Sequence, residues 1–381
     1  MHNSNWKQIK LGDCLKLVNG RAYKQHELLS EGTPVLRIQN LNGGINWYYS
    51  DLELPEKNYC NKGDLLFAWS ATFGPYRWNG DKAIFHYHIW NVIPQNNIDV
   101  GFAYYLLLNI SASVKEAAHG ITMVHITKEK MENWLIQLPP LAEQKRIAAI
   151  LDKADSLRLK NQQAIQLADR FLRAVFLDLF GDPMTNPKGW ERCKFESLIN
   201  MVTYGLTVRP EYLAEGVPLI SAREIRSGQI NFDGAPKISE KDFGKLSEKA
   251  RPNFQDILFS KTGSIGHCAI VEGNLKFAVT QNAARIVPNT EKCEPLFLLS
   301  LLRTNYFFDL ANREAKGNAV KDLQLGVMKE FPVYAPPMDI QRKYVEIFKR
   351  IKKLSSMNFD AQLDGNELFN SISQRAFAGE L

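Results

Sequence analysis

Cysteine and histidine are scarce in this chain of 381 residues, and neither is arranged as in a metal site. The five cysteines are odd in number and widely scattered, and no two form a CxxC pair, so neither a zinc site nor a disulfide framework is supported. His86 and His88 form one close histidine pair, but no acidic or cysteine residue adjoins them. We therefore predict no bound metal and a reducing, cytoplasmic setting.

The sequence also lacks the short motifs of common nucleotide-dependent and hydrolytic enzymes. Its 24 glycines include no G-x-G turn, and the chain contains no GxxxxGK[ST], HExxH or GxSxG motif. Both Pro-Pro pairs follow an apolar residue, Leu138 or Ala335, whereas an amino-methyltransferase has Asn or Asp at that point. We therefore predict a binding protein that is not an enzyme and holds no cofactor.

Long apolar runs are missing as well, because no stretch approaches the roughly 20 apolar residues of a membrane helix. A hydrophobic content of 45% and a charged content of 23% are ordinary for a globular protein, and the length suffices for two or three domains. The formal net charge of +6 is compatible with a nucleic-acid partner. Charge of this size does not decide the question, since many basic proteins bind no nucleic acid.

What the chain does contain is a repeat at about half its length. WKQIKLGD and WERCKFES begin the two copies, and NKGDLLFAWSATFG and FQDILFSKTGSIG follow in each, as do LPPLAEQKRIAAIL and APPMDIQRKYVEIF. The separation grows from 184 positions at the first pair to 197 at the last, as expected if loops gain residues while the framework is kept. In each copy, short apolar runs such as GTPVLRI, GDLLFAW and IWNVIP predict strands, and GFAYYLLLNISAS and EPLFLLSLLRTNYFFDL predict buried helices.

Each copy ends in a predicted helix of about 40 residues that opens at a Pro-Pro pair. Apolar residues recur every three or four positions, and neither Gly nor Pro interrupts 141–180, whereas Gly365 weakens the second helix. Helices of roughly 60 Å are typical of coiled-coil spacers, and a pseudo-two-fold axis would make their pairing antiparallel. We therefore predict an α+β (mixed α/β) fold with globules at 1–138 and 183–335 and spacer helices at 139–182 and 336–381.

Two asparagines fall at equivalent places on the apolar stripes of these helices. Asn161 and Asn358 are 197 positions apart, each near the middle of its helix. The midpoints of an antiparallel pair meet, so we expect the two amides to face each other and to fix the register of the helices. The alternative is that both side chains are solvated.

The architecture resembles the specificity (S) subunit of type I restriction–modification enzymes over essentially the whole chain. The resemblance is carried by LPPLAEQKRIAAILDKAD at 138–155, FLRAVFLDLFGDP at 171–183 and QRAFAGEL at 374–381. It implies that each globule is a target recognition domain that reads one half of a split double-stranded DNA sequence. It also implies that the helices set the half-site spacing and dock two modification subunits, with restriction subunits joining in some complexes. S-adenosylmethionine and ATP would then be bound by those partners.

Base readout requires polar side chains at base edges, and phosphate contacts set the orientation. Loops at equivalent places in the two copies, whose framework matches while the polar residues differ, supply the candidates. We expect DNA contacts from Trp69, Ser70, Thr72, His86, His88, Thr122, His125 and Lys128 in the first copy, and from Lys261, Thr262, Ser264, Gln281, Asn282, Arg285, Asn318 and Lys321 in the second. In this alignment His86 and His88 lie opposite Gln281 and Asn282. Because the copies differ strongly, we expect a non-palindromic target.

The start of each spacer helix is kept in both copies, which favours it as the surface for the modification subunits. The residues concerned are Leu141, Gln144 and Arg146 in the first helix and Met338, Gln341 and Tyr344 in the second. Three alternatives stay open: a self-sufficient DNA enzyme, a coiled-coil adaptor that binds protein instead of DNA, and the specificity chain of a related system that cuts on both sides of its site.

Overall fold

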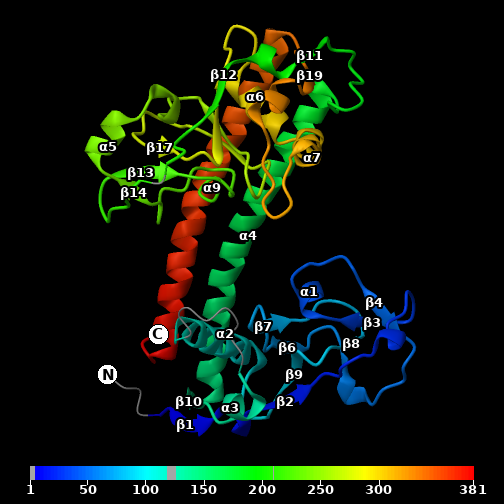
Figure 1. The fold of residues 1–381 in the computed structure, drawn as a ribbon. Helices are drawn as coiled ribbons and strands as arrows, with labels where there is room; N and C mark the ends of the chain where they lie inside the picture. The colour runs from blue at the N-terminus through cyan, green and yellow to red at the C-terminus, as the bar shows by residue number, and fades with distance from the viewer. Residues whose placement is uncertain (1–4, 118–125, 209) are drawn as a thin grey trace. The chain divides into compact units, whose positions relative to one another are not determined.

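The computed structural model describes residues 5–117, 126–208 and 210–381, and for residues 116, 117 and 356–364 it describes the backbone alone. The chain divides into two compact units. Unit 1 consists of Met1–Gln162 together with Phe359–Leu381, and unit 2 consists of Gln163–Asn358. Each unit therefore contains one copy of the repeat and a part of both long helices (Figure 1).

The described part of unit 1 forms three small sheets. Their strands are β1 (Lys7–Lys10), β2 (Leu15–Asn19), β3 (Thr33–Leu36), β4 (Tyr48–Ser50), β5 (Tyr59–Cys60), β6 (Leu65–Ala68), β7 (Gly74–Arg77), β8 (Ala83–Phe85), β9 (Ile89–Pro94) and β10 (Leu135–Leu138). They pair in the orders β1-β10, β2-β9-β6-β7 and β4-β3-β8-β5. The β2-β9-β6-β7 sheet is antiparallel throughout, whereas β3 and β8 run parallel.

Unit 2 repeats this topology. Its strands are β11 (Arg192–Lys194), β12 (Ile199–Tyr204), β13 (Val217–Ile220), β14 (Lys237–Ile238), β15 (Ile257–Ser260), β16 (Cys268–Ile270), β17 (Ala278–Val279), β18 (Ala283–Pro288) and β19 (Pro332–Tyr334). They pair in the orders β11-β19, β12-β18-β15-β16 and β14-β13-β17. Each order matches its counterpart in unit 1 strand for strand, apart from β5. The duplication inferred from the sequence is thus present in the fold.

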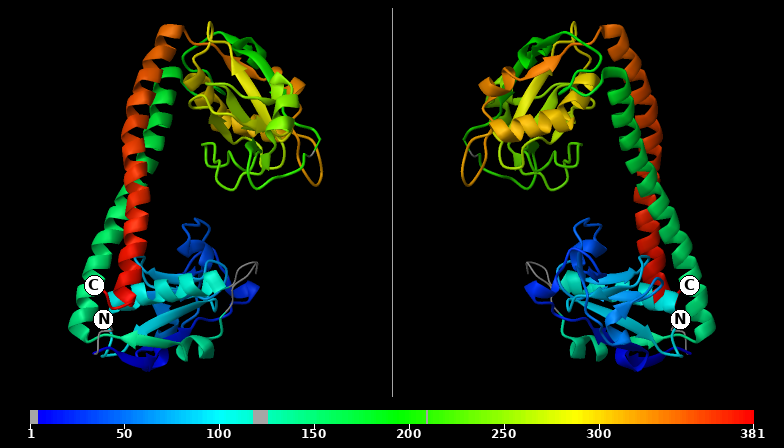
Figure 2. Two further views of the ribbon diagram at one scale, coloured as in Figure 1. Left: turned by 90° about the vertical axis from the view of Figure 1, so that its left-hand side faces the viewer. Right: turned by 90° about the vertical axis from the view of Figure 1, so that its right-hand side faces the viewer.

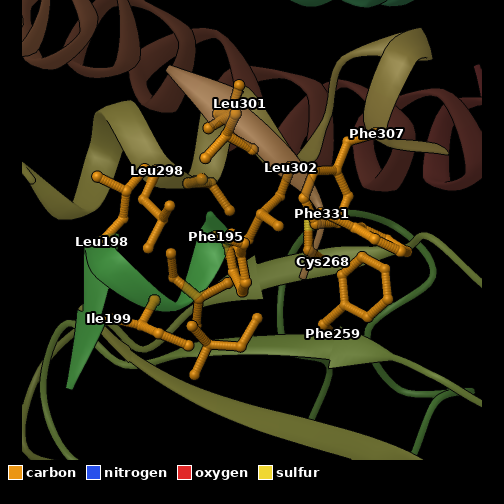
Figure 3. Close-up of a cluster of buried hydrophobic side chains, with 14 of the residues drawn as sticks. Phe195, Leu198, Ile199, Phe259, Cys268, Leu298, Leu301, Leu302, Phe307 and Phe331 are labelled. Carbon is orange, nitrogen blue, oxygen red and sulfur yellow. The ribbon is translucent and has the colours of Figure 1, made fainter. Parts of the chain in front are cut away.

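Short helices cover the sheets and close a core in each unit. Unit 1 has α1 (Ile38–Leu41), α2 (Val100–Ala117) and α3 (Lys128–Glu132), and unit 2 has α5 (Glu240–Lys245), α6 (Pro295–Leu302), α7 (Asn305–Glu314) and α8 (Leu325–Lys329). In unit 2, the rings of Phe195, Phe259 and Phe331 surround Phe307 at centroid distances of 5.4, 6.0 and 5.4 Å (Figure 3). Burial of such large apolar side chains is the main favourable term in folding the unit.

The run predicted as one helix at 294–310 is two helices in the structure. Helix α6 ends before Arg303, and Thr304 caps α7 by accepting a hydrogen bond from the Phe307 backbone N–H at 3.3 Å. A threonine at this place gives the chain a way to end one helix and start another. The three predicted strands of the first copy are confirmed as β3, β6 and β9.

The two long helices are α4 (Leu141–Phe180) and α9 (Met338–Phe377), and each begins directly after its Pro-Pro pair. Helix α9 continues through Gly365 without a break, so the predicted weakness there does not end the helix. In unit 1, Ile147 and Leu151 of α4 share a core with Phe369 of α9, and both views of Figure 2 show the end of α9 beside the start of α4. In unit 2, Phe180 of α4 packs on Tyr344 of α9 at 5.4 Å. The α+β class and the antiparallel contact of the helices are confirmed. In the described part of the chain, no helix is both long and apolar enough to cross a membrane.

Candidate functional site

Ten of the sixteen predicted DNA-contacting residues lie at one tip of each unit. Tip 1 consists of the loop 69–73 after β6 and the turn 86–88 before β9, and tip 2 consists of the loop 261–266 after β15 and the turn 280–282 before β18. Both turns are held by the same backbone hydrogen bonds. The N–H of Tyr87 donates to Arg21 O (3.0 Å) as that of Gln281 donates to Leu206 O (2.8 Å).

A second pair of bonds ties each turn to its loop. The N–H of Trp69 donates to His88 O, and that of Lys261 donates to Asn282 O, both at 3.1 Å. Tyr87 therefore corresponds to Gln281, and His88 to Asn282. His88 thus lies opposite Asn282, as in the sequence alignment. His86 lies opposite Thr280 and not Gln281, because the N–H of His86 bonds to Leu36 O as that of Thr280 bonds to Ile220 O.

A glycine lets the chain cross close to each turn. A Cβ on Gly20 would lie 2.4 Å from His86 O, and one on Gly205 would lie 1.7 Å from Val279 O. No side chain can be accommodated at such distances. The close crossing explains why the framework of the tips is the same in both units although their side chains differ.

Tip 1 is aromatic. The Tyr87 ring lies 4.4 Å from the His86 ring and 3.9 Å from the His88 ring, and the Trp69 indole N–H donates to Tyr87 O at 2.8 Å. Burial, with smaller contributions from His88 and Arg37, lowers the pKa of His86 to about 4. His86 is thus neutral at pH 7 and presents no positive charge to a phosphate.

The loop of tip 1 is anchored from inside. Ser70 is buried, and Phe73 packs edge-on against Phe67 with centroids 5.2 Å apart. Ala71 and Phe73 have positive φ angles of 59° and 37°, conformations that non-glycine residues adopt only when the surroundings impose them. Thr72 is exposed and accepts a hydrogen bond from the Asn42 side-chain amide at 3.4 Å. The loop therefore presents Thr72 outward and withdraws Ser70.

Tip 2 is polar, and its lysine is already paired. The Lys261 side chain is 11% exposed, and its ammonium forms an ion pair with Asp322, to which the Thr262 hydroxyl also donates. The Leu323 N–H donates to Lys261 O at 2.8 Å, so this group ties the segment 316–323 to the tip. Lys261 and Thr262 thus hold the loop in place, and a direct base contact by Lys261 would require its pairing with Asp322 to be broken.

Four other predicted residues of unit 2 are exposed, namely Ser264, Gln281, Asn318 and Lys321. Ser264 accepts a hydrogen bond from the Arg226 guanidinium at 3.0 Å, and the Lys321 ammonium reaches Asn312 O at 3.4 Å. Asn282 is half-buried beside them. These residues present donors and acceptors of the kind that read base edges and phosphates.

Arg285 does not belong to this surface, and its prediction as a DNA contact is wrong. It is 3% exposed, its Nε donates to Asp256 Oδ2 at 2.6 Å, and one of its terminal nitrogens donates to Glu248 O at 2.6 Å. The corresponding residues of unit 1 are Asn91 and Asp64, whose side chains hydrogen-bond at 3.4 Å. Arg285 is an internal brace between β18 and the chain before β15.

The third predicted loop site is described only in part. Thr122 and His125 lie outside the described residues. Lys128, the first residue of α3, is half-exposed and pairs with Glu132 one turn later at 3.5 Å. A pair at this spacing is a common helix-surface contact and is open to water.

The two glutamines predicted as partner contacts are buried, so that prediction is wrong for them. Gln144 accepts a hydrogen bond from the Asp99 N–H (2.8 Å) and donates to Asn97 O and Pro139 O (3.0 and 2.8 Å). Gln341 accepts from the Glu294 N–H (2.9 Å) and donates to Lys292 O and Pro336 O (3.2 and 2.7 Å). Each glutamine satisfies three backbone groups that would otherwise be unpaired.

The other residues of this predicted surface differ among themselves. Tyr344 is 1% exposed and donates to the Ser300 hydroxyl at 2.8 Å, so it is a core residue and the prediction is wrong for it as well. Arg146 is exposed, pairs with Glu143 at 2.6 Å and donates to Leu381 O at 2.7 Å. Leu141 is exposed and Met338 is half-buried, so a partner can reach both.

Exposed apolar residues on the helices were missed by the sequence reasoning. In unit 2, Leu167 and Phe171 lie one turn apart on α4 and are 61% and 50% exposed. An apolar residue every three or four positions predicts a packed stripe, but this spacing does not separate neighbouring positions at the edge of the stripe, so it did not mark Phe171 as exposed. Large apolar side chains exposed together on a helix are typical of a binding surface.

Asn161 lies where the two long helices face each other within unit 1. It is half-buried, and a Cβ on Gly365 of α9 would lie 4.0 Å from its Nδ2. The side chain of Asn358 is outside the described residues. The contact between the two amides therefore stays a prediction.

A cleft in unit 1 brings ionisable side chains together. The cleft, of about 470 Å³, is lined by Arg77, Asp152 and Lys145 among others, but Arg77 and Asp152 form an ion pair at 2.9 Å and Asp152 accepts the Tyr105 hydroxyl at 2.8 Å. Burial, followed by this hydrogen bond, raises the pKa of Tyr105. Within the described ranges, no group of three or more His, Cys, Asp or Glu side chains could hold a metal ion. The cleft thus shows a structural ion pair beside a tyrosine.

Comparisons with known proteins agree with the duplicated architecture. The chain is 26% identical to the EcoBI specificity subunit of a type I restriction enzyme from Escherichia coli, over 100% of this chain and 87% of that protein. It is 22% identical to the MjaVIII specificity subunit of Methanocaldococcus jannaschii, over 92% and 87%. The crystal structure of the S subunit from M. genitalium has a similar fold, with a TM-score of 0.60 at 15% identity over 99% of this chain and 97% of that one.

The family model described as the type I restriction modification DNA specificity domain matches twice, at residues 3–168 and 187–360. Each match spans one globule and the first part of the long helix that follows it. Together the two matches account for most of the sequence and coincide with the two copies of the repeat. The chain belongs to the family of type I restriction–modification DNA specificity subunits.

Proposed function

We propose that each unit reads one half of a split, non-palindromic DNA sequence with its tip, and that the chain is the non-catalytic part of a larger methylating complex. The observation that carries this proposal is the pairing of identical backbone bonds with different side chains at tips 1 and 2. A common framework keeps the geometry of reading, and the side chains on it select the bases. Two unlike tips would select two unlike half-sites.

The partners in this proposal are two modification subunits that bind S-adenosylmethionine and methylate adenine in both half-sites, with ATP-dependent restriction subunits joining in some complexes. The exposed Leu167 and Phe171 of α4 support docking on the helices, because a partner that covers them removes apolar surface from water. In unit 1, Leu141 and Arg146 at the start of α4 are also exposed to a partner. The target adenine would be turned out of the helix into the modification subunit, so this chain supplies position and sequence.

The experiment is methylation mapping of a host genome with the intact gene, without it, and with a Leu167→Ser/Phe171→Ser variant. We expect one split adenine-methylation motif that disappears without the gene and weakens strongly in the variant, together with loss of co-purified modification subunits. Arg173→Ser, an exposed change on another side of α4, is the matched control. A genome with no change in methylation on deletion would contradict the proposal. Modification by the purified chain alone would favour an enzyme instead.

A further inference from the structure

Tyr87 and Gln281 occupy the same position of the framework and differ most in chemistry. Their N–H groups donate to equivalent carbonyls, those of Arg21 and Leu206, at 3.0 and 2.8 Å. Tyr87 is 39% exposed and Gln281 is exposed as well, although both belong to turns with a tightly bonded backbone. A fixed backbone with a side chain directed to solvent has little conformational entropy to lose when it meets a partner.

The surroundings of the two side chains show what each can read. Tyr87 is flanked by the rings of His86 and His88, and the lowered pKa of His86 leaves that neighbour uncharged at pH 7. Gln281 stands in a polar setting beside Asn282 and the paired Lys261. Within the residues that the structure describes, no hydrogen bond is found for the Gln281 side-chain amide. That amide is free to use both its donor and its acceptor.

The chemistry of base edges then separates the two tips. A glutamine amide matches the N6 donor and N7 acceptor of adenine in the major groove. A tyrosine in an uncharged aromatic setting offers a ring face and one hydroxyl, which suit the thymine methyl group or a stacked base. These are different readouts from one shared position.

We infer that residue 87 in unit 1 and residue 281 in unit 2 are the equivalent specificity-determining residues of the two half-sites, with Gln281 reading an adenine and Tyr87 making an aromatic contact. The inference rests on the proposed function and deepens it, since it names the kind of base contact at one position of each half-site. The sequence reasoning passed over Tyr87, because its polar candidates were the histidines on either side.

The test uses the full complex of this chain with its modification subunits, and DNA oligonucleotides that carry each of the four base pairs at every position of both half-sites. In Gln281→Ala, we expect the preference for adenine at one position of one half-site to fall by roughly 5- to 150-fold, the worth of a bidentate base contact. Gln281→Glu should transfer the preference at the same position toward cytosine, because a carboxylate accepts from its N4 group. Tyr87→Ala should relax one position of the other half-site.

Exposed residues elsewhere in the same units provide matched controls, Gln229→Ala in unit 2 and Tyr48→Ala in unit 1. Equal losses for all four base pairs, an unchanged preference, or changes in both half-sites from one substitution would overturn the inference. These outcomes are distinct from failure of the proposed function, in which the intact complex itself would show no split motif. If the intact complex shows a split motif and neither Gln281→Ala nor Gln281→Glu alters it, this inference is contradicted and the proposed function is not.

Discussion

Gln144 and Gln341 hold equivalent places in the two units, as do Asn91 and Arg285, and as do Tyr87 and Gln281. The first pair is identical and makes three equivalent hydrogen bonds in each unit. In the second pair, a neutral Asn91 and a charged Arg285 each bond to the equivalent aspartate of their unit. The third pair shares only its backbone hydrogen bonds. Difference between the units thus increases from the joint with the long helix, through the sheet, to the tip.

This gradient separates what the duplicated fold requires from what it leaves free. At the joint, three backbone groups must be satisfied, and a buried glutamine has the matching donors and acceptor. In the turn of each tip, backbone bonds hold residues 87 and 281 without help from their side chains, so these two residues can change at little cost to the fold. A protein whose target must vary benefits from having its variable residues at such places.

The largest contrast that we expect between the units concerns the brace in the sheet. Arg285→Ala leaves Asp256 buried and without its charge partner, so unit 2 should lose about 3–5 kcal/mol of stability. Asn91→Ala removes a neutral amide from Asp64 in unit 1 and should cost about 1 kcal/mol. Hydrogen exchange of β15 and β18 against β6 and β9 measures each unit separately, since two units need not unfold in one step.

DNA specificity supplies the second readout for this pair. If Arg285 braces the sheet, milder Arg285→Lys protein that stays folded should keep its preference among bases. A changed base preference at one half-site with full stability would restore Arg285 as a reading residue. Equal losses from Arg285→Ala and Asn91→Ala would show that the charge adds nothing to the brace.

A smaller and symmetric effect is expected at the joint. Gln144→Ala leaves the Asp99 N–H and two carbonyls without their partner, and Gln341→Ala does the same to the Glu294 N–H. Water reaches part of each site, so each variant should lose about 2 kcal/mol in its own unit. Exchange protection of α2 and of α6 would report the losses.

Exposed glutamines of α4 serve as controls, Gln162→Ala for unit 1 and Gln163→Ala for unit 2. A loss in one unit only would show that the two joints are not equivalent in energy despite their equal bonds. Failure to co-purify modification subunits while the unit stays fully protected would return the glutamines to the partner surface.

The sequence predicted the architecture well for an identifiable reason. A duplicated chain gives two versions of each element, so the apolar runs, Pro-Pro pairs and helix lengths of one copy could be checked against those of the other. Strands β3, β6 and β9 and the starts of α4 and α9 lie where these patterns placed them. Hydrophobic periodicity shows which residues face a core, so it predicts well the elements that pack on one.

The candidate site was predicted less well, because duplication does not say what a kept residue is kept for. Gln144 and Gln341 recur because each bonds to the backbone of its own unit. A residue kept for binding a partner would recur in the sequence in the same way. Arg285 is polar and adjoins a predicted loop. It is buried against Asp256, which lies 29 positions earlier in the chain, and only the pairing of the strands brings the two residues together. Tyr87 was not predicted because backbone hydrogen bonds of the turn decide which of its residues is exposed. No pattern in the sequence shows those bonds.

A further contrast that we expect between the units concerns their response to pH, and it comes from His86 of tip 1. Thr280 stands at the same place in tip 2 and does not titrate. Since the folded pKa of His86 is about 4 and the unfolded value is about 6.5, the unfolded chain binds a proton first as pH falls. Unit 1 should therefore lose stability between pH 7.5 and 5, and His86→Thr should reduce that loss.

Arg37 and Glu27 allow the effect of His86 to be isolated. His88 and Arg37 contribute to the lowered pKa of His86, so Arg37→Gln should bring that pKa closer to its usual value and narrow the pH effect. Glu27 has a pKa lowered to about 2, chiefly by its hydrogen bond with Arg21, and its contribution is lost only below about pH 4.5. Exchange protection in β8 and β9, measured at pH 7.5 and 5 and corrected for intrinsic rates, is the readout. Equal losses in the wild type and His86→Thr would mean that the histidine is not what distinguishes the two tips in their response to acid.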